Sequence, residues 1–212
     1  MSHLTTFDAA FARCPLVAIL RGVQPHVVEA IGDALLDAGF TILEVPLNSP
    51  DPYESITRLS KKLEGFAVVG AGTVLSVEQV ERVEAAGGTL IIAPNANTAV
   101  IAAAAQRGLV PMPGIATPTE AFAALEAGAS ALKLFPAEAA SPTVMKAMRA
   151  VLPRDVRMLP VGGIVPSVLE EWHKAGAAGY GLGSALYVPG MDAATVGERA
   201  RAFVEAWQVL AR

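Results

Sequence analysis

The stretch "DAGFTILEVPL", residues 37–47, changes character at its glycine. The residues before Gly39 continue an Ala-rich helical pattern, and the residues after it form a short run of Ile, Leu and Val. Glycine adopts the left-handed backbone conformation at low cost, so it commonly ends a helix. The stretch therefore predicts a helix that stops at Gly39 and a buried strand over 41–47.

The same unit recurs along the chain. Helical patterns end in a glycine at Gly39, Gly65, Gly87, Gly108, Gly128 and Gly176. A short apolar run stands at residues 16–22, 41–47, 67–74, 90–95, 109–114, 131–136, 156–163 and 178–184. Near-continuous apolar strands that alternate with helices indicate a parallel sheet.

Eight such units in 212 residues predict an α/β protein, a (β/α)8 TIM barrel formed as a single domain over 1–212. The N-terminus predicts a short amphipathic helix that caps the barrel, and a last helix is expected near 192–210. A doubly wound open sheet is the alternative.

The composition argues against several classes of protein. The net charge is −4 without a long basic run, which gives nucleic-acid binding little support. Cys14 is the single cysteine, so we expect no internal disulfide and a cytoplasmic location. No apolar stretch reaches the ~18 residues of a membrane span, and the N-terminus lacks the pattern of a secretory signal. No metal-ligand spacing joins the histidines, so no metal is expected. The motif "GAGT" does not match G-x-G-x-x-G, which gives a dinucleotide little support, and no cofactor is expected.

Two ionisable residues lie within the predicted strands. Side chains alternate between the two faces of a strand, which places Glu44 opposite Leu43 and Val45. The same alternation places Lys133 opposite its leucine neighbours in "ALKLFP". Both groups therefore point into the predicted barrel interior. One interpretation is a structural buried ion pair. The other is a nucleophilic lysine whose pKa is lowered by burial, with a carboxylate that moves protons.

Polar and glycine residues gather at the predicted strand ends. The turns "VGGIVPS" and "GLGSALY" follow strands seven and eight, where barrels often bind phosphate through backbone N–H groups. The candidates are Gly162, Gly163, Gly183 and Ser184, and ordinary tight turns are the alternative. Arg21 could hold a substrate carboxylate by a bidentate contact. Thr73 could add a hydroxyl donor, and Pro94 could line the pocket.

Six motifs, in order between about residue 15 and 208, resemble the class I 2-keto-3-deoxy-6-phosphosugar aldolases, the KDPG/KHG aldolase family: "VAILRG", "EVPLNSP", "GAGTVL", "ALKLFP", "VGG" and "GLGS". The resemblance implies a trimeric (β/α)8 barrel that needs no metal. It also implies cleavage of a six-carbon phosphorylated keto acid into pyruvate and D-glyceraldehyde 3-phosphate.

By position, the resemblance makes Lys133 the Schiff-base lysine and Glu44 the proton-transferring glutamate. It implies pyruvate-carboxylate contacts for Arg21 and Thr73, and a phosphate site at Gly163, Gly183 and Ser184. Two branches of the family differ in the C4 configuration of their substrates. Asn48 and Val161 resemble the phosphogalactonate branch, where the phosphogluconate branch typically has arginine and threonine. The expected substrate is therefore 2-dehydro-3-deoxy-6-phospho-D-galactonate, with its C4 epimer as the alternative.

Two other classes compete with an aldolase. A phosphosugar isomerase or epimerase on the same barrel would use Glu44 as a base without a covalent lysine. A non-catalytic sugar-phosphate-binding barrel would need neither group, and an inward-facing amine at residue 133 argues against it.

Overall fold

The computed structural model describes residues 2–211, and every strand pair in this part of the chain is parallel. One curled sheet has six strands, in the order β5 (Val110–Met112), β4 (Leu90–Ile92), β3 (Val68–Gly72), β2 (Ile42–Pro46), β1 (Leu16–Ile19) and β9 (Tyr180–Leu182). A second sheet consists of β6 (Gly114–Ile115), β7 (Leu132–Leu134) and β8 (Met158–Pro160). The predicted α/β class with parallel strands is confirmed.

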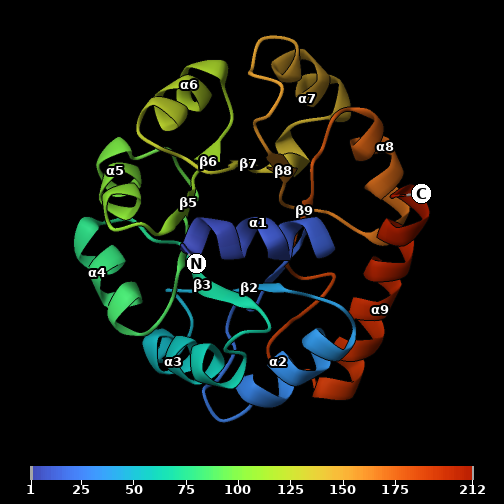
Figure 1. Cartoon of the computed structure of the whole chain (residues 1–212). Helices are drawn as coiled ribbons and strands as arrows, with labels where there is room; N and C mark the ends of the chain where they lie inside the picture. Colours follow the sequence, from blue (N-terminus) through green and yellow to red (C-terminus); the bar gives the residue numbers. More distant parts are fainter. Residues whose placement is uncertain (1, 212) are drawn as a thin grey trace.

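Helices follow the strands and form a ring around both sheets (Figure 1). They are α2 (Val28–Asp37), α3 (Pro52–Lys62), α4 (Val77–Ala85), α5 (Thr98–Gln106), α6 (Pro118–Glu126), α7 (Pro142–Arg149), α8 (Leu169–Lys174) and α9 (Ala193–Leu210). Two 3₁₀ turns, η1 (Ala137–Ala139) and η2 (Pro166–Val168), follow β7 and β8. The last helix lies where the sequence predicts it.

The predicted helix stops are present. All six of the predicted glycines have φ between 71° and 106°. After α2, the N–H groups of Gly39 and Phe40 donate to the carbonyls of Leu36 and Leu35, each at 2.9 Å. Because φ is 106° at Gly39, a side chain at this position would be strained. Several helices begin at a side-chain cap, such as the reciprocal pair of Thr117 and Glu120 at the start of α6.

The fifth predicted strand, residues 109–114, differs from the expectation because it is split into β5 and β6. Pro113 separates the two parts, and a proline has no N–H to donate to a neighbouring strand. Its carbonyl accepts from the N–H of Lys133 at 2.9 Å, so the chain continues beside β7. The described residues therefore hold nine strands instead of the expected eight.

Backbone contacts also join the two sheets at both borders. The N–H of Ser130 donates to the carbonyl of Pro111, and the N–H of Ala178 donates to that of Met158, each at 2.9 Å. An isolated parallel bridge pairs Val161 with Gly181. The second sheet is thus attached to β5 on one side and to β9 on the other.

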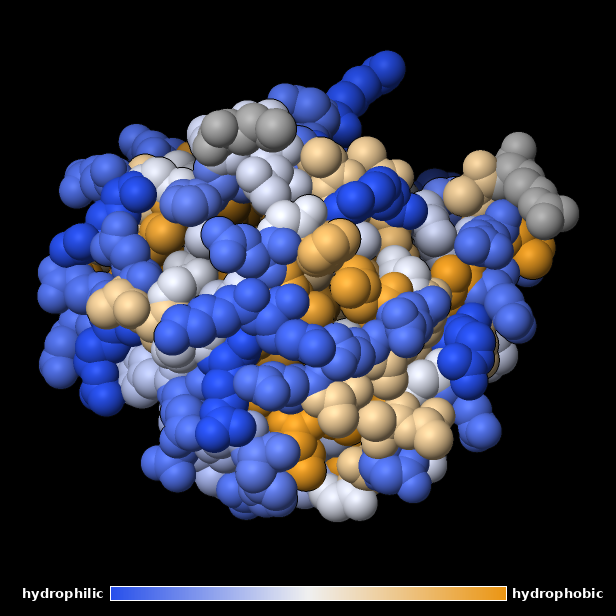
Figure 2. Space-filling view, turned by 60° about the horizontal axis from the view of Figure 1, so that its bottom comes forward, coloured by the Kyte–Doolittle hydropathy of each residue, from blue (hydrophilic) through white to orange (hydrophobic). Residues whose placement is uncertain are grey.

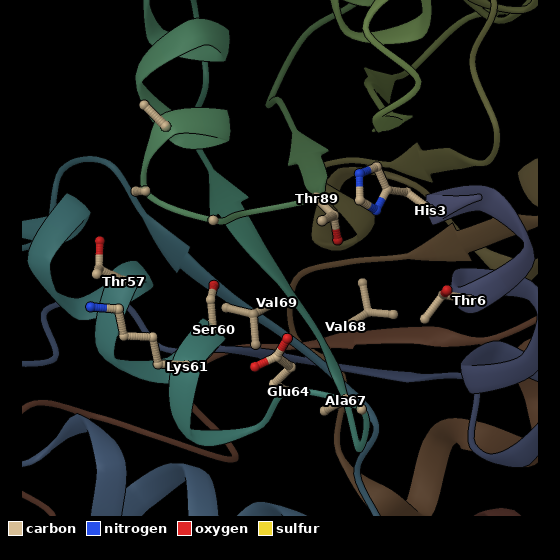
Figure 3. A pocket seen from close by; sticks show the side chains of 14 residues that line it. His3, Thr6, Thr57, Ser60, Lys61, Glu64, Ala67, Val68, Val69 and Thr89 are labelled. Carbon is tan, nitrogen blue, oxygen red and sulfur yellow. The ribbon is translucent and has the colours of Figure 1, made fainter. Parts of the chain in front are cut away.

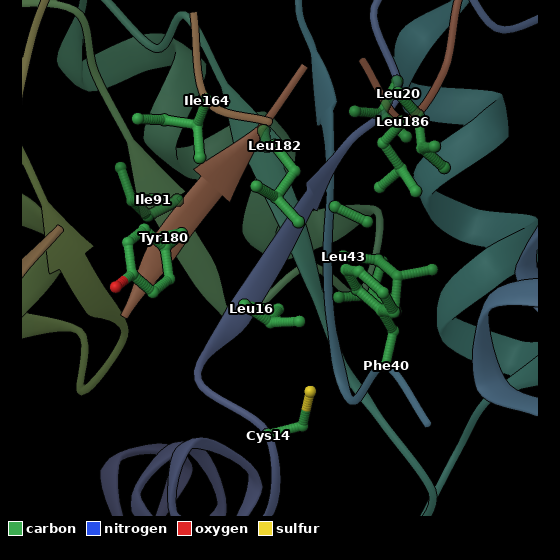
Figure 4. Packing of buried hydrophobic residues seen from close by; sticks show 14 of the residues in the cluster. Cys14, Leu16, Leu20, Phe40, Leu43, Ile91, Ile164, Tyr180, Leu182 and Leu186 are labelled. Carbon is green, nitrogen blue, oxygen red and sulfur yellow. The ribbon is translucent and has the colours of Figure 1, made fainter. Parts of the chain in front are cut away.

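Buried side chains separate into an outer and an inner cluster. The outer cluster fills the space between strands and helices and includes Leu43, Val45, Leu132 and Leu134 (Figure 4 shows part of it). The inner cluster contains Ile42 and Ala131, and it lies on the concave face of the strands. Because Glu44 and Lys133 alternate with members of the outer cluster, they share the concave face, as the sequence predicts.

The expected N-terminal helix is α1 (His3–Arg13), which lies across the centre of the helix ring in Figure 1. Its residues Phe7, Ala10 and Phe11 belong to the inner cluster, with Ile42 and Val68 from the starts of β2 and β3. The helix therefore covers the end of the concave face at which the strands begin, and it leaves the opposite end for a site.

The surface is mainly polar on the face drawn in Figure 2, where hydrophobic residues form smaller patches among hydrophilic ones. Within residues 2–211, none of the helices has the length and the apolar composition that a bilayer crossing requires.

Candidate active site

Lys133 and Glu44 reach the concave face from different sheets. Lys133 is the middle residue of β7, and Glu44 is the middle residue of β2. The two residues are only 7% and 1% exposed, although both side chains are ionisable. Both side chains point to the concave face, and the charge of each shifts the pKa of the other group.

Burial dominates the electrostatics of this pair. It raises the pKa of the Glu44 carboxyl to about 7, against the opposing effects of the Lys133 and Arg21 charges and the Gly72 backbone. Burial also lowers the pKa of the Lys133 ammonium group, which Glu44 raises and Arg21 lowers further. A larger fraction of the Lys133 amine is therefore neutral in this site than in water. The neighbouring Glu44 carboxyl group can accept and release protons near neutral pH.

Glycine makes room for the Glu44 carboxylate. A Cβ atom at Gly72, the last residue of β3, would collide with both carboxylate oxygens. Within residues 2–211, the Oε2 atom of Glu44 has no hydrogen-bond partner. Buried polar atoms are normally paired, so this oxygen is available to a substrate hydroxyl or to water. The second glycine of "GAGT", Gly72, is the sequence feature that permits the close approach of the Glu44 carboxylate.

Arg21 follows β1, and its charge lowers the pKa of both groups. Its Nη1 atom donates to Oδ1 of Asn48 at 2.6 Å, and Asn48 itself follows β2. The next residues of the two loops are also joined, because the N–H of Gly22 donates to Oγ of Ser49 at 2.9 Å. The sequence predicts a site role for Arg21, but no local pattern predicts its contact with Asn48, 27 positions away.

A cavity of about 530 Å³ opens above Lys133 at the end where the strands finish. Seven of the predicted site residues line it: Arg21, Lys133, Val161, Gly162, Gly163, Gly183 and Ser184. Glu44 is too deeply buried to form part of the cavity wall. Phe135 also lines the cavity, and its ring centroid lies 4.4 Å from Nζ of Lys133. The lysine, the arginine and both glycine turns therefore face a common space.

Thr73 and Pro94 are not part of the described cavity wall. Thr73 follows β3 with a φ of 57°, in the left-handed region that β-branched residues rarely adopt. Such strain persists only where the surrounding structure imposes it, and it is frequent at functional sites. The carbonyl of Pro94 approaches Gly114 so closely that a Cβ atom there would collide with it. Both residues follow their strands at the end where the cavity opens.

Glu138 is a cavity residue that the sequence does not predict. It lies on η1, and its carboxylate packs against the first glycine turn, where a Cβ atom at Gly162 would collide with it. The alternation of a strand ends before this residue, so no periodic pattern indicates where its side chain points.

Metal ligands do not gather in this region. Within residues 2–211, no three His, Cys, Asp or Glu side chains come together in a way that could hold a metal ion.

Residues 7–197 match the family described as KDPG and KHG aldolase. The chain belongs to the KDPG and KHG aldolase family. This aldolase is 47% identical over 196 residues to the probable 2-dehydro-3-deoxy-6-phosphogalactonate aldolase of Rhizobium meliloti (strain 1021), with 92% of each chain covered. It is 46% identical to the 2-dehydro-3-deoxy-6-phosphogalactonate aldolase of Escherichia coli (strain K12), with 92% of this chain and 96% of that chain covered.

A solved structure described as native KDPGal has the same architecture as this aldolase. The two chains are 46% identical and superpose with a TM-score of 0.92, over 94% of this aldolase and 97% of the other chain. The family resemblance stated from the motifs is therefore confirmed, and the protein is a carbon–carbon lyase.

Proposed function

We propose that this aldolase cleaves 2-dehydro-3-deoxy-6-phospho-D-galactonate to pyruvate and D-glyceraldehyde 3-phosphate through a Schiff base on Lys133. The observation that carries the proposal is a buried lysine amine beside a buried carboxyl group, at the floor of a cavity of about 530 Å³. The names of the two relatives support the substrate.

The reaction begins at Lys133. Its neutral amine attacks the C2 carbonyl carbon of the substrate. Protonated Glu44 then gives its proton to the carbinolamine hydroxyl, which leaves as water to form a protonated Schiff base. Burial favours this step because it lowers the pKa of the amine. Arg21 binds the C1 carboxylate, and this ion pair places C2 within reach of the amine.

Glu44 then transfers protons. Its carboxylate accepts the proton of the C4 hydroxyl, directly or through water, and the C3–C4 bond breaks. The bonding electrons move into the Schiff base to form an enamine, and D-glyceraldehyde 3-phosphate leaves. Glu44 returns the proton to C3, and hydrolysis of the Schiff base releases pyruvate, the free amine and a proton that Glu44 accepts. A pKa of about 7 suits a group that must accept and release a proton in one cycle.

The phosphate group is proposed to bind the two glycine turns through backbone N–H groups of Gly162, Gly163, Gly183 and Ser184. All four residues line the same cavity as Lys133, which supports this assignment. The Glu138 carboxylate packs against the first turn, so phosphate binding requires this side chain to turn away. Glu138 is exposed, so its rotated carboxylate can be solvated.

Val161 and Asn48 support the galactonate epimer. Val161 lines the cavity with methyl groups and offers no hydrogen bond to the sugar hydroxyls. Thr73 and Pro94 are proposed to act at the rim, and the strained backbone of Thr73 supports its part. The alternative substrate is the C4 epimer, 2-dehydro-3-deoxy-6-phospho-D-gluconate.

A coupled assay of pyruvate release from each of the two epimers tests the proposal. We expect turnover of the galactonate epimer, at a higher rate than that of the gluconate epimer. Equal rates or the reverse preference would overturn the assignment of Val161 and Asn48 as specificity markers. Absence of turnover with either epimer would overturn the aldolase reaction itself.

The architecture is proposed to be a single (β/α)8 barrel over 1–212, although Met1 and Arg212 lie outside the described residues. The backbone contacts at both borders between the two sheets support closure. We also propose a cytoplasmic homotrimer. The family resemblance supports the trimer, and the buried free thiol of Cys14 suits a reducing compartment. Sedimentation should give three times the mass of one chain, and the mass of a monomer would contradict the trimer.

A further inference from the structure

Arg21 differs from three other arginines of the chain in the chemistry of its side-chain partner. The guanidinium groups of Arg58, Arg107 and Arg157 pair with carboxylates. Arg21 instead donates to the amide oxygen of Asn48 at 2.6 Å, and within residues 2–211 no carboxylate lies within salt-bridge distance of its guanidinium group. An amide oxygen orients a guanidinium group without neutralising its charge.

We propose that Asn48 is a positioning residue, which aims the Arg21 guanidinium group into the cavity and leaves its positive charge free for the substrate carboxylate. The inference rests on the proposed function, because it assigns a task to Asn48 in pyruvate binding. The loops that carry the two residues are held together by the adjacent contact between Gly22 and Ser49. The pair therefore lies on a doubly anchored segment at the cavity rim.

The free charge of Arg21 matters for two groups at once. An uncompensated guanidinium group at the exposed rim of the cavity can bind a carboxylate through a charge-assisted contact, which solvent screens in part. The same charge acts on Lys133, whose pKa it lowers. Lys133 also faces Glu44 from β2, and Glu138 and Tyr187 line the same cavity. An added negative charge beside Arg21 should therefore weaken pyruvate binding and leave more of the lysine protonated.

The substitution Asn48→Asp separates position from charge. Aspartate has the size of asparagine and keeps an oxygen for Arg21, but it adds a negative charge. Asn48→Ala instead removes the anchor and leaves the arginine charge intact. Asn95→Asp is the matched control, since it adds the same charge on the loop after β4, and Asn95 makes no hydrogen bond to Arg21.

Borohydride trapping of the pyruvate adduct, followed by mass spectrometry across pyruvate concentration and pH, measures both effects. For Asn48→Asp we expect the pyruvate concentration at half-trapping to rise about tenfold or more, and the pH midpoint of trapping to move upward. For Asn48→Ala we expect a smaller rise, of about threefold to tenfold, without an upward shift of the midpoint. Asn95→Asp should behave as the wild type.

The outcomes separate this inference from the proposed function. If wild-type protein forms no trapped adduct, the Schiff-base function fails. If wild-type protein is trapped and folded Asn48→Asp matches it in both half-trapping concentration and pH midpoint, the positioning role of Asn48 is wrong. Equal changes in Asn48→Asp and Asn95→Asp would also overturn it. Circular dichroism and thermal unfolding confirm that each variant is folded.

Discussion

Two cavities of similar size lie at opposite ends of the strands. The cavity above Lys133 has a volume of about 530 Å³, and one between α1, α3 and α4 has about 650 Å³. The residues that line the larger cavity include serine and threonine, together with His3, Lys61 and Glu64 (Figure 3). These three ionisable residues are exposed. In the smaller one Lys133 is only 7% exposed, and Glu44 below it is 1% exposed.

The two cavities differ in how far water reaches their ionisable side chains. Ionisable groups in contact with water keep their ordinary chemistry, whereas burial changes which protonation state is favoured. A lysine that must be neutral to react therefore gains from the cavity at which Lys133 is buried. Volume alone would favour the other cavity, whereas desolvated charge favours the cavity that holds the family motifs.

Lys133→Ala should have the largest effect. Without the amine no Schiff base forms, so pyruvate release should fall by at least about 1,000-fold and the borohydride adduct should disappear. Mass spectrometry after trapping with pyruvate measures the adduct directly. A persistent adduct in this variant would mean that another lysine, Lys61 included, is the nucleophile.

Glu44→Gln should slow proton transfer by about 100- to 10,000-fold, because glutamine cannot accept or release the proton. Exchange of the pyruvate methyl protons with deuterated water, followed by NMR, measures this step. Trapping of pyruvate should persist, since Lys133 remains. Exchange at the wild-type rate would contradict the role of Glu44.

The pH dependence of stability should report on the burial of Glu44. Its folded pKa of about 7 lies above the model-peptide value of 4.5, so the folded state keeps a proton that the unfolded state has released. The contribution of this group to stability is fully present below pH 4.5 and is lost as pH rises through about 7. The free energy of unfolding is measured in urea at pH 5 and at pH 8. Between these two pH values, the stability of Glu44→Gln relative to wild type should increase by up to about 3 kcal/mol. A pH-independent difference would show that Glu44 is solvated.

Val161→Thr should change the choice between epimers more than the chemistry. The added hydroxyl group can bond to the sugar and should shift the ratio of kcat/KM values toward the gluconate epimer by about tenfold. The two-epimer pyruvate assay measures the ratio. An unchanged ratio would remove Val161 from the specificity determinants.

Lys61→Ala should have the smallest effect, because it alters only the second cavity. Surface substitutions away from special features change stability by less than about 0.5 kcal/mol, and we expect turnover within about twofold of wild type. A loss of activity comparable to that of Glu44→Gln would show that the larger cavity takes part in catalysis, and the comparison of the two cavities would fail.

Much of the fold follows from local patterns in the chain. Helix-stop glycines and apolar runs predict the alternating elements, because both depend on backbone and side-chain properties within a few residues. The period of two along a strand also predicts that Glu44 and Lys133 point to the concave face. The site residues at strand ends follow from the same periodicity, together with the parallel arrangement.

What the amino-acid sequence determined by itself is therefore the order of the elements and the direction of the side chains within each strand. Only the tertiary structure decided the split of the fifth strand at Pro113, the contact of Arg21 with Asn48 and the place of Glu138 against Gly162. It also left Thr73 and Pro94 outside the cavity wall and brought the pKa of Glu44 to about 7. These features depend on distances between residues far apart in the chain and on how much water remains around each group. Register and curvature set those quantities, and they arise only when the strands pack together.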